Sequence, residues 1–260
     1  MNRLNDGERG IFRRFQAGYG AIGLLVSGAL AAVLLLTVSY LPGFGQADRP
    51  TENEVSQRYI AKGLEETGAT NVVAAVILDY RAFDTLGESA VLFAALAAVI
   101  LLLREEPAAL ARRMAERKPF EPDQGPILRI TARVLIPWLL LFGAYLVLNG
   151  HLSPGGGFSG GAVTGAAMIL HNLAFGPEQT RRFLSERIFF RLLVGALCFY
   201  GLAKGYVFFT GGNHLPGSIP LGQAGSIFSG GLIGPLNIAV GIVTACAVYG
   251  IFALFDRGGW

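Results

Sequence analysis

Charged residues are scarce in this chain, and their scarcity argues against an ordinary soluble fold. Asp, Glu, Lys and Arg make up 15% of the 260 residues, and hydrophobic residues make up 52%, whereas about 25% of an ordinary soluble domain is charged. The basic residues form no cluster interleaved with aromatic residues, so we predict no nucleic-acid partner. The composition instead indicates a protein of the lipid bilayer.

Metal ligands and reactive thiols are also scarce. The two cysteines, Cys198 and Cys246, lie in apolar runs, where we expect small buried hydrophobic residues. The three histidines, His151, His171 and His214, are far apart and lack the Cys or Glu-x-x-His spacing of a metal site. No nucleophile–base constellation is visible. We therefore predict that the chain is not an enzyme and binds no metal or cofactor of its own.

Long apolar runs, by contrast, are abundant. A membrane-spanning helix needs about 20 apolar residues, and six runs approach or exceed that length. The sequence predicts an all-α integral membrane protein with about six transmembrane helices, over residues 18–41, 85–103, 127–148, 158–175, 188–210 and 228–255. Residues 51–67 are compatible with a short surface helix.

Basic residues are distributed unevenly between the predicted loops. They are concentrated before the first span and in the loops after the second and fourth spans. By the positive-inside rule, loops rich in Lys and Arg lie in the cytoplasm. We therefore expect the N- and C-termini to be cytoplasmic.

A charged, proline-containing linker divides the spans into two groups. We predict a two-helix module over residues 1–105, a cytoplasmic linker over residues 106–126 and a four-helix module over residues 127–260.

A glycine-rich corner separates the third and fourth spans, over residues 149–161. Glycine and proline are the costliest residues inside a helix, so this stretch is not an ordinary helix. Residues 155–160 match the pattern G-x-G-x-x-G, but they follow a membrane helix rather than a strand, and no acidic residue lies about 20 positions later. We therefore reject a dinucleotide site and favour close packing of helices.

A similar corner recurs between the fifth and sixth spans. The stretches beginning at His151 and Phe158 resemble those beginning at His214 and Phe228. Two interpretations stay open. The last four spans are two copies of one helical hairpin, as in repeat-built transporters, or two glycine-rich corners are similar by chance.

Ionisable residues at membrane depth are the candidates for ion chemistry. Asp84 and Glu88 are four residues apart and share a face of a helix, and Asp79 and Arg81 lie just before them. Such groups are costly in a bilayer, so they pair or line wet cavities. Either Arg81 pairs with Asp79 or Asp84 as a structural anchor, or the acids form a proton or cation relay.

Two further ionisable residues lie in the later spans. Lys204, inside the fifth span between Gly201 and Gly205, is either a relay element or half of a structural ion pair. His171 lies near the inner end of the fourth span, where a packing histidine is the simpler interpretation. Small-residue pairs such as Gly161/Gly165, Gly201/Gly205 and Gly230/Gly234 predict close helix packing.

Two motifs resemble known membrane proteins. The corner, Asn149-Gly150-His151-x-x-Pro154-Gly155-Gly156-Gly157-Phe158-x-Gly160-Gly161, resembles the signature of the MnhB-like, B-type component of Mrp-type sodium/proton antiporters. Ser159 replaces the usual glutamine. The segment from Asn71 to Glu88 is similar to the C-terminal end of the large A-type component of those antiporters, a segment that forms a separate small polypeptide in membrane-bound hydrogenases.

The resemblance implies a subunit of a Mrp-type or complex-I-like assembly in a prokaryotic cell membrane. Its implied partners are large antiporter-like subunits, and Na⁺ or H⁺ is the implied transported ion. On this hypothesis Asp79, Asp84 and Glu88 form an access point on the outer side, and Lys204 and His171 continue the path. The alternative is a structural role, in which the chain packs between antiporter-like modules without carrying ions. Whether the parent complex is an antiporter or a hydrogenase stays open.

Overall fold

The computed structural model describes residues 6–41, 53–103, 126–213 and 219–257. Within these ranges the chain is helical and contains no strand. It forms two compact units, Met1–Ser56 and Gln57–Trp260. The fold is therefore all-α, as predicted.

The first unit contains one long helix, α1, over Asp6–Ser39. Its segment Gly20–Ser39 is long and apolar enough to cross a membrane, and none of that segment is buried. The apolar surface of α1 therefore needs lipid or other membrane helices around it.

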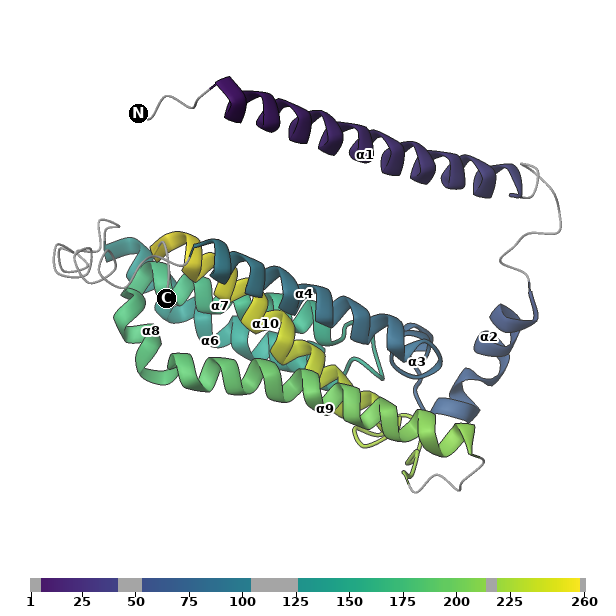
Figure 1. Cartoon of the computed structure of the whole chain (residues 1–260). Coiled ribbons are helices and arrows are strands. Elements are labelled where there is room, and N and C mark those ends of the chain that lie inside the picture. Colours follow the sequence, from purple (N-terminus) through teal and green to yellow (C-terminus); the bar gives the residue numbers. More distant parts are fainter. Residues whose placement is uncertain (1–5, 42–52, 104–125, 214–218, 258–260) are drawn as a thin grey trace. The chain divides into compact units, whose positions relative to one another are not determined.

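The second unit holds the other helices, of which α2 begins just before the boundary, at Glu54 (Figure 1). Five of them are long and apolar enough to span a bilayer, which together with α1 confirms the six predicted spans. The surface helix predicted over residues 51–67 is α2. The elements are α2 (Glu54–Thr67), α3 (Val72–Ala75), the π-helix η1 (Val76–Tyr80), α4 (Ala82–Leu102), α6 (Pro126–Leu148), α7 (Gly157–Phe175), α8 (Pro177–Phe183), α9 (Glu186–Gly212) and α10 (Ile233–Arg257).

Helix α10 is the centre of the second unit. In its apolar segment 67% of the residues are buried, against 33% or less in the other spans. It packs against α4, α6, α7 and α9 (Figure 1). Its buried side chains, among them Leu236, Val240 and Val243, join Leu96 of α4 and Phe189 of α9 in the main hydrophobic core.

Glycines hold α7 tightly against α10. A Cβ atom at Gly157 would lie 2.5 Å from the carbonyl oxygen of Asn237, and one at Gly161 would lie 2.6 Å from the carbonyl oxygen of Gly241. One at Gly165 would lie 2.9 Å from Cβ of Val248. Real Cβ atoms do not approach this closely, so these positions need glycine. The packing role predicted for Gly161 and Gly165 is confirmed.

The other two predicted glycine pairs behave differently. Added Cβ atoms at Gly201, Gly205 and Gly234 would meet no atom of the described residues within 4 Å. These glycines therefore bring no helix of the described part of this chain into close contact.

The two similar corners have different conformations. Phe158 and Gly161 lie in the first turns of α7, whereas Phe228 precedes α10, which begins only at Ile233. Gly230 has φ of 82° and Gly231 has φ of 53°, values that favour glycine. They form a turn there, which is why the sixth span begins later than predicted. His214 lies outside the described residues.

The two predicted modules are in contact through α4. This helix belongs to the predicted two-helix module, and it packs against α9 and α10 of the four-helix module. Almost all of the linker over residues 106–126 lies outside the described residues, so the boundary there stays a prediction.

Candidate functional site

Asp79 lies on an irregular segment between two helices. Asn71 starts this segment, and its Oδ1 accepts hydrogen bonds from the backbone N–H groups of Val73 and Ala74. The π-helix η1 follows, and the chain then leaves helical geometry at Arg81, with φ of −119° and ψ of 36°. Single π-helical turns are rare and are frequent at functional sites.

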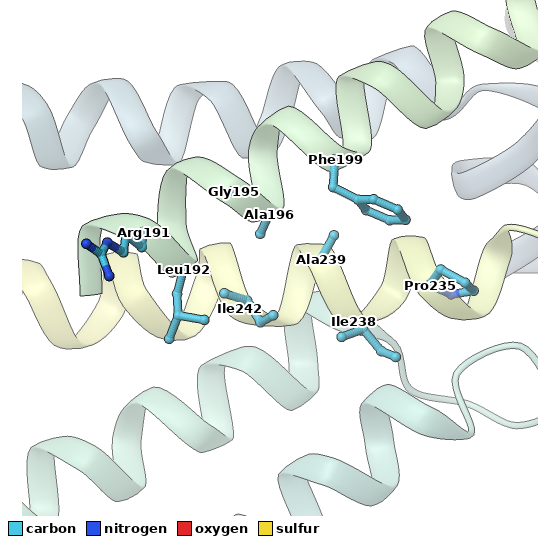
Figure 2. Close-up of a pocket in the computed structure, with 9 residues that line it drawn as sticks. All are labelled: Arg191, Leu192, Gly195, Ala196, Phe199, Pro235, Ile238, Ala239 and Ile242. Carbon is cyan, nitrogen blue, oxygen red and sulfur yellow. The ribbon is translucent and has the colours of Figure 1, made fainter. Parts of the chain in front are cut away.

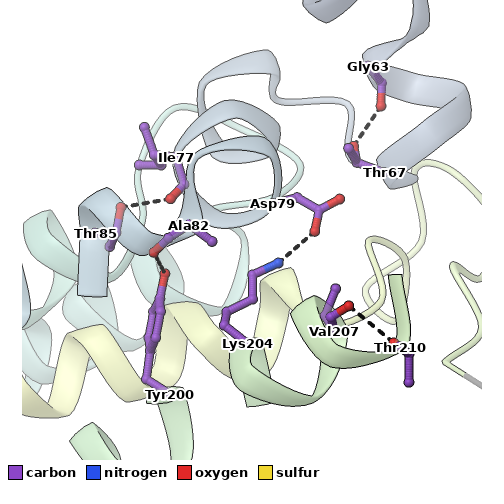
Figure 3. A network of polar contacts seen from close by, with 10 residues as sticks. All are labelled: Gly63, Thr67, Ile77, Asp79, Ala82, Thr85, Tyr200, Lys204, Val207 and Thr210. Carbon is purple, nitrogen blue, oxygen red and sulfur yellow. Dashed lines mark hydrogen bonds and ion pairs between the residues drawn. The ribbon is translucent and has the colours of Figure 1, made fainter. Parts of the chain in front are cut away.

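Lys204 of α9 pairs with Asp79. Its Nζ donates a hydrogen bond of 2.7 Å to Oδ1 of Asp79 (Figure 3). The Lys204 side chain is 3% exposed, and that of Asp79 is 34% exposed. The two residues are 125 positions apart in the sequence. A buried ammonium is costly unless it is paired, and Asp79 supplies that partner.

Two further hydrogen bonds hold the helix break in place. Tyr200, one turn before Lys204 on α9, donates through its hydroxyl to the carbonyl oxygen of Ala82 at 2.9 Å. Thr85 donates to the carbonyl oxygen of Ile77 at 2.7 Å (Figure 3). Carbonyl groups left unpaired at membrane depth cost several kcal/mol each. Tyr200 and Lys204 therefore attach both sides of the break to one face of α9.

A cavity of about 180 Å³ adjoins the ion pair. Asp79, Thr67 and Thr210 line it, together with Gly230 and Gly231 from the loop before α10. Apolar side chains, Ile219, Leu221 and Leu232 among them, form much of the remaining lining, and the space is large enough to admit water beside the polar groups. The Asp79 carboxylate therefore contacts a buried ammonium on one side and this cavity on the other.

Asp84 and Glu88 do not join this pair. Arg81 forms its ion pair with Asp84, and both side chains are more than half exposed. This decides between the two partners considered for Arg81. Glu88 is exposed on α4, and no hydrogen bond or ion pair connects it to the described residues. Both acids therefore lie on the outside of this chain.

His171 occupies a separate place near the C-terminal end of α7. Its Nδ1 lies 2.8 Å from the Thr180 hydroxyl oxygen, and its ring contacts those of Phe175 and Phe183. Helix α8 connects α7 to the N-terminal end of α9. Lys204 lies about 27 Å along α9 from that end. The described residues therefore do not bring His171 and Lys204 together, and a path between them stays a prediction.

The glycine-rich corner is clamped by Asn71. The Asn71 side-chain amide donates to the carbonyl oxygens of Gly150 at 2.8 Å and Ser153 at 2.9 Å. Its backbone N–H donates to the carbonyl oxygen of His151 at 3.1 Å. These bonds tie the segment before Asp79 to the corner. Sequence reasoning missed the role of Asn71 because both partners are backbone carbonyls about 80 residues away.

The corner itself is closely packed. His151 is buried, with Nε2 3.3 Å from the carbonyl oxygen of Ser226. The backbone N–H of Gly157 donates to Oδ1 of Asn237 at 2.9 Å. A Cβ atom at Gly160 would lie 2.6 Å from the Gly143 carbonyl oxygen of α6. These contacts support the packing interpretation. The other motif residues are less enclosed or serve the turn. Pro154 is exposed, and Phe158 is half-buried against the core. Gly155 and Gly156 have φ of 155° and 135°.

An exposed polar cluster fixes α2 beside the site. Arg58 forms an ion pair of 2.9 Å with Glu66, and the Tyr80 hydroxyl donates to the same carboxylate. The Tyr59 and Tyr80 rings stack with centroids 4.5 Å apart. Hydrogen bonds from Arg58 and Tyr80 lower the pKa of Glu66. Burial and the bond to Glu66 raise the pKa of Tyr80 to about 12.

Known proteins are similar to this chain in sequence and fold. A family model described as a domain related to the MnhB subunit of Na⁺/H⁺ antiporters matches residues 127–250. A chain in the structure of the membrane-bound sulfane sulfur reductase, an archaeal respiratory membrane complex, is 30% identical with a TM-score of 0.63. The match covers 90% of this chain and 96% of that chain. This chain belongs, together with that chain, to a family of membrane subunits that carry an MnhB-related domain.

Other matches of this MnhB-related chain extend to its N-terminal part. The MbhE family model, which describes one of the MBH subunits, matches residues 24–118. This match confirms that both predicted resemblances occur in one chain. A protein of Rhizobium meliloti (strain 1021), named as the A/B component of a K⁺/H⁺ antiporter, is 30% identical over 182 residues, which are 64% of this chain and 17% of that protein.

The structure of the Mrp complex from Dietzia sp. DQ12-45-1b supports the fold. One of its chains matches with 23% identity and a TM-score of 0.60, covering 100% of this chain and 27% of that chain. The MnhB-related chain therefore spans about a quarter of that neighbour and a smaller share of the rhizobial relative.

Proposed function

We propose that this chain is a membrane subunit of a multisubunit Mrp-type cation/proton antiporter, or of a related complex-I-like ion-translocating complex, in a prokaryotic cell membrane. Its membership of the MnhB-related family supports this proposal. So do the two structural neighbours, which are chains of multisubunit membrane complexes. Antiporter subunits move ions rather than transform substrates. The proposal therefore assigns the chain to ion movement, whether or not a redox reaction drives the parent complex.

Large antiporter-like subunits are the proposed partners. The apolar segment of α1 has no buried residue, and α6 exposes Trp138, Phe142 and Tyr145. Apolar surfaces of this size are unfavourable in water, so lipid or neighbouring helices cover them.

Within the complex, the Asp79–Lys204 pair is the proposed ion-handling element. Asp79 lines the cavity of about 180 Å³ and also holds the buried ammonium of Lys204. A cation or proton that reaches Asp79 from the cavity competes with that ammonium for the same carboxylate. Arrival of the ion and movement of Lys204 are therefore coupled by charge. The contact of the Asp79 carboxylate with both the cavity and the Lys204 ammonium is the observation on which this assignment rests.

Glu88 marks the proposed continuation of the path. It lies in the membrane-spanning part of α4, is exposed, and has no polar partner among the described residues. An ionisable group in the bilayer faces a polar partner or a wet cavity. The next polar group therefore belongs to a neighbouring subunit.

A purely structural role is the second candidate function. Two observations support it: Asp79 and Lys204 form a direct ion pair within this chain, and glycines pack α7 closely against α10. In this case the charges serve the stability of the assembly and carry no ions.

A charge-removal series in the assembled complex separates the two functions. Asp79→Asn alone leaves a buried ammonium without its partner, which costs roughly 3 kcal/mol, so we expect reduced assembly. The double variant Asp79→Asn/Lys204→Met removes both charges, so we expect it to assemble. Assembly is followed on native gels, and cation/proton exchange is followed in membrane vesicles with a pH-sensitive dye.

The exchange rate of the assembled double variant distinguishes ion handling from a structural role. If the pair handles ions, exchange is lost although the complex is intact. Exchange at the wild-type rate would show that the pair is structural. The matched control is Lys62→Gln/Glu65→Gln, which removes one exposed charge of each sign from α2. Exposed charges of this kind contribute at most about 1 kcal/mol, so this control should exchange normally.

A further inference from the structure

An apolar groove runs between α6 and α9, with α10 as its floor. It consists of two adjoining cavities of about 370 Å³ each, which share Leu192, Ile238 and Ile242. One cavity follows the contact between α9 and α10, where Figure 2 shows Arg191 at one end and Phe199 and Pro235 toward the other. The second extends across α10 to Val147 and Leu148 of α6.

The groove has the shape of two connected limbs. Gly195 of α9 and Gly241 of α10 line the walls, and a Cβ atom at Gly195 would meet nothing within 4 Å. From Arg191 to Phe199 the limb along α9 is about 12 Å long. This length fits within the roughly 15 Å of hydrocarbon in one leaflet.

Arg191 is the charged residue of the groove. It is exposed, and it makes no ion pair or side-chain hydrogen bond with the residues that the structure describes. It lies five residues after the start of α9, about 7.5 Å along the axis, which is headgroup depth for a spanning helix. A guanidinium at this depth binds phosphate oxygens in bidentate fashion.

We propose that the groove binds one anionic phospholipid. Its phosphate lies at Arg191, and its two acyl chains occupy the two limbs. The leaflet is the one on the side of the basic loops, which the positive-inside rule assigns to the cytoplasm. A helix of another subunit would also fill an apolar groove, but it would need an acidic residue at this one depth. A lipid phosphate is present at that depth in any membrane.

Photo-crosslinking in the full complex tests the occupant. The cross-linker p-benzoylphenylalanine replaces Phe199, the complex is purified and washed in detergent, and phosphatidylglycerol is added back before irradiation. We expect an adduct with the mass of phosphatidylglycerol on this chain. A cross-link from position 199 to another protein subunit would overturn the proposal.

Matched variants test the two parts of the site. Arg191→Ala should reduce the phosphatidylglycerol adduct about tenfold, the effect of losing a charge-assisted hydrogen bond, and Arg191→Lys should restore part of it. Arg187→Ala makes the same charge change one turn earlier on α9 and outside the groove, so it should leave the yield unchanged. Equal yields from Arg191→Ala and Arg187→Ala would refute the phosphate contact.

A groove-filling variant keeps the test decisive if Arg191→Ala does not assemble. Gly195→Leu projects into open space in the groove and should abolish the phosphatidylglycerol adduct. Gly201→Leu, on the same helix and also in open space, should leave that adduct in place. Undiminished adducts with Gly195→Leu would show that the groove is not the lipid site.

Discussion

Replacing Gly161 by alanine tests whether glycine contacts set the distance between α7 and α10. The new Cβ atom would lie 2.6 Å from the Gly241 carbonyl oxygen and 2.7 Å from Cβ of Thr244. Ordinary contact begins near 3.4 Å, so the two helices must separate locally by about 0.8 Å, the difference between 3.4 and 2.6 Å. Overpacking of this kind costs about 1–3 kcal/mol.

Helix propensity acts in the opposite direction and needs its own control. Alanine is favoured over glycine in a helix by about 1 kcal/mol, so Gly161→Ala by itself mixes a gain with a loss. Gly201→Ala provides the gain alone, because its Cβ atom meets open space. We expect the free energy of unfolding of Gly161→Ala to lie about 1–3 kcal/mol below that of Gly201→Ala.

The measurement is an SDS titration of the purified chain in mixed micelles, followed by far-UV circular dichroism. Both variants are compared with the wild type at the same detergent concentration. If Gly161→Ala and Gly201→Ala unfold at the same free energy, close packing at Gly161 does not limit the approach of α7 to α10.

Two further predictions concern residues outside the spans. Asn71→Ala removes the cap of α3 and two hydrogen bonds to the corner, at Gly150 and Ser153. It should therefore lower the free energy of unfolding by about 2–4 kcal/mol in the same titration. Asn71→Asp keeps the cap and should lose less stability, and equal losses for the two variants would show that the cap contributes nothing. Because Arg58 lowers the folded-state pKa of Glu66, this carboxylate stabilises the fold above the unfolded-state pKa, and that stability is lost as the pH falls through the folded-state value. Glu66→Gln should therefore show a smaller acid-induced fall of the SDS midpoint than the wild type, and an identical pH dependence would refute the assignment.

Sequence alone was sufficient for the properties that depend on local composition. The six spans could be predicted because bilayer thickness sets the length of each apolar run independently of the rest of the chain. The corner at residues 149–161 was recognisable because glycine and proline exclude a helix locally, and the family resemblance rests on that motif. The acids Asp84 and Glu88 could be placed on one helix face from their spacing.

Tertiary structure alone decided which charges meet. Lys204 and Asp79 are 125 residues apart, and no periodicity relates positions on separate helices. Their contact depends on the packing of α4 against α9 and α10 and on the π-helical turn that carries Asp79. Asn71 became important for the same reason, since its partners are backbone carbonyls with no sequence signature. Arg81 had two acids in reach, and in the folded chain Asp79 pairs with Lys204 while Asp84 pairs with Arg81. Spans are therefore local properties of this chain, whereas its charge pairs are properties of the folded bundle.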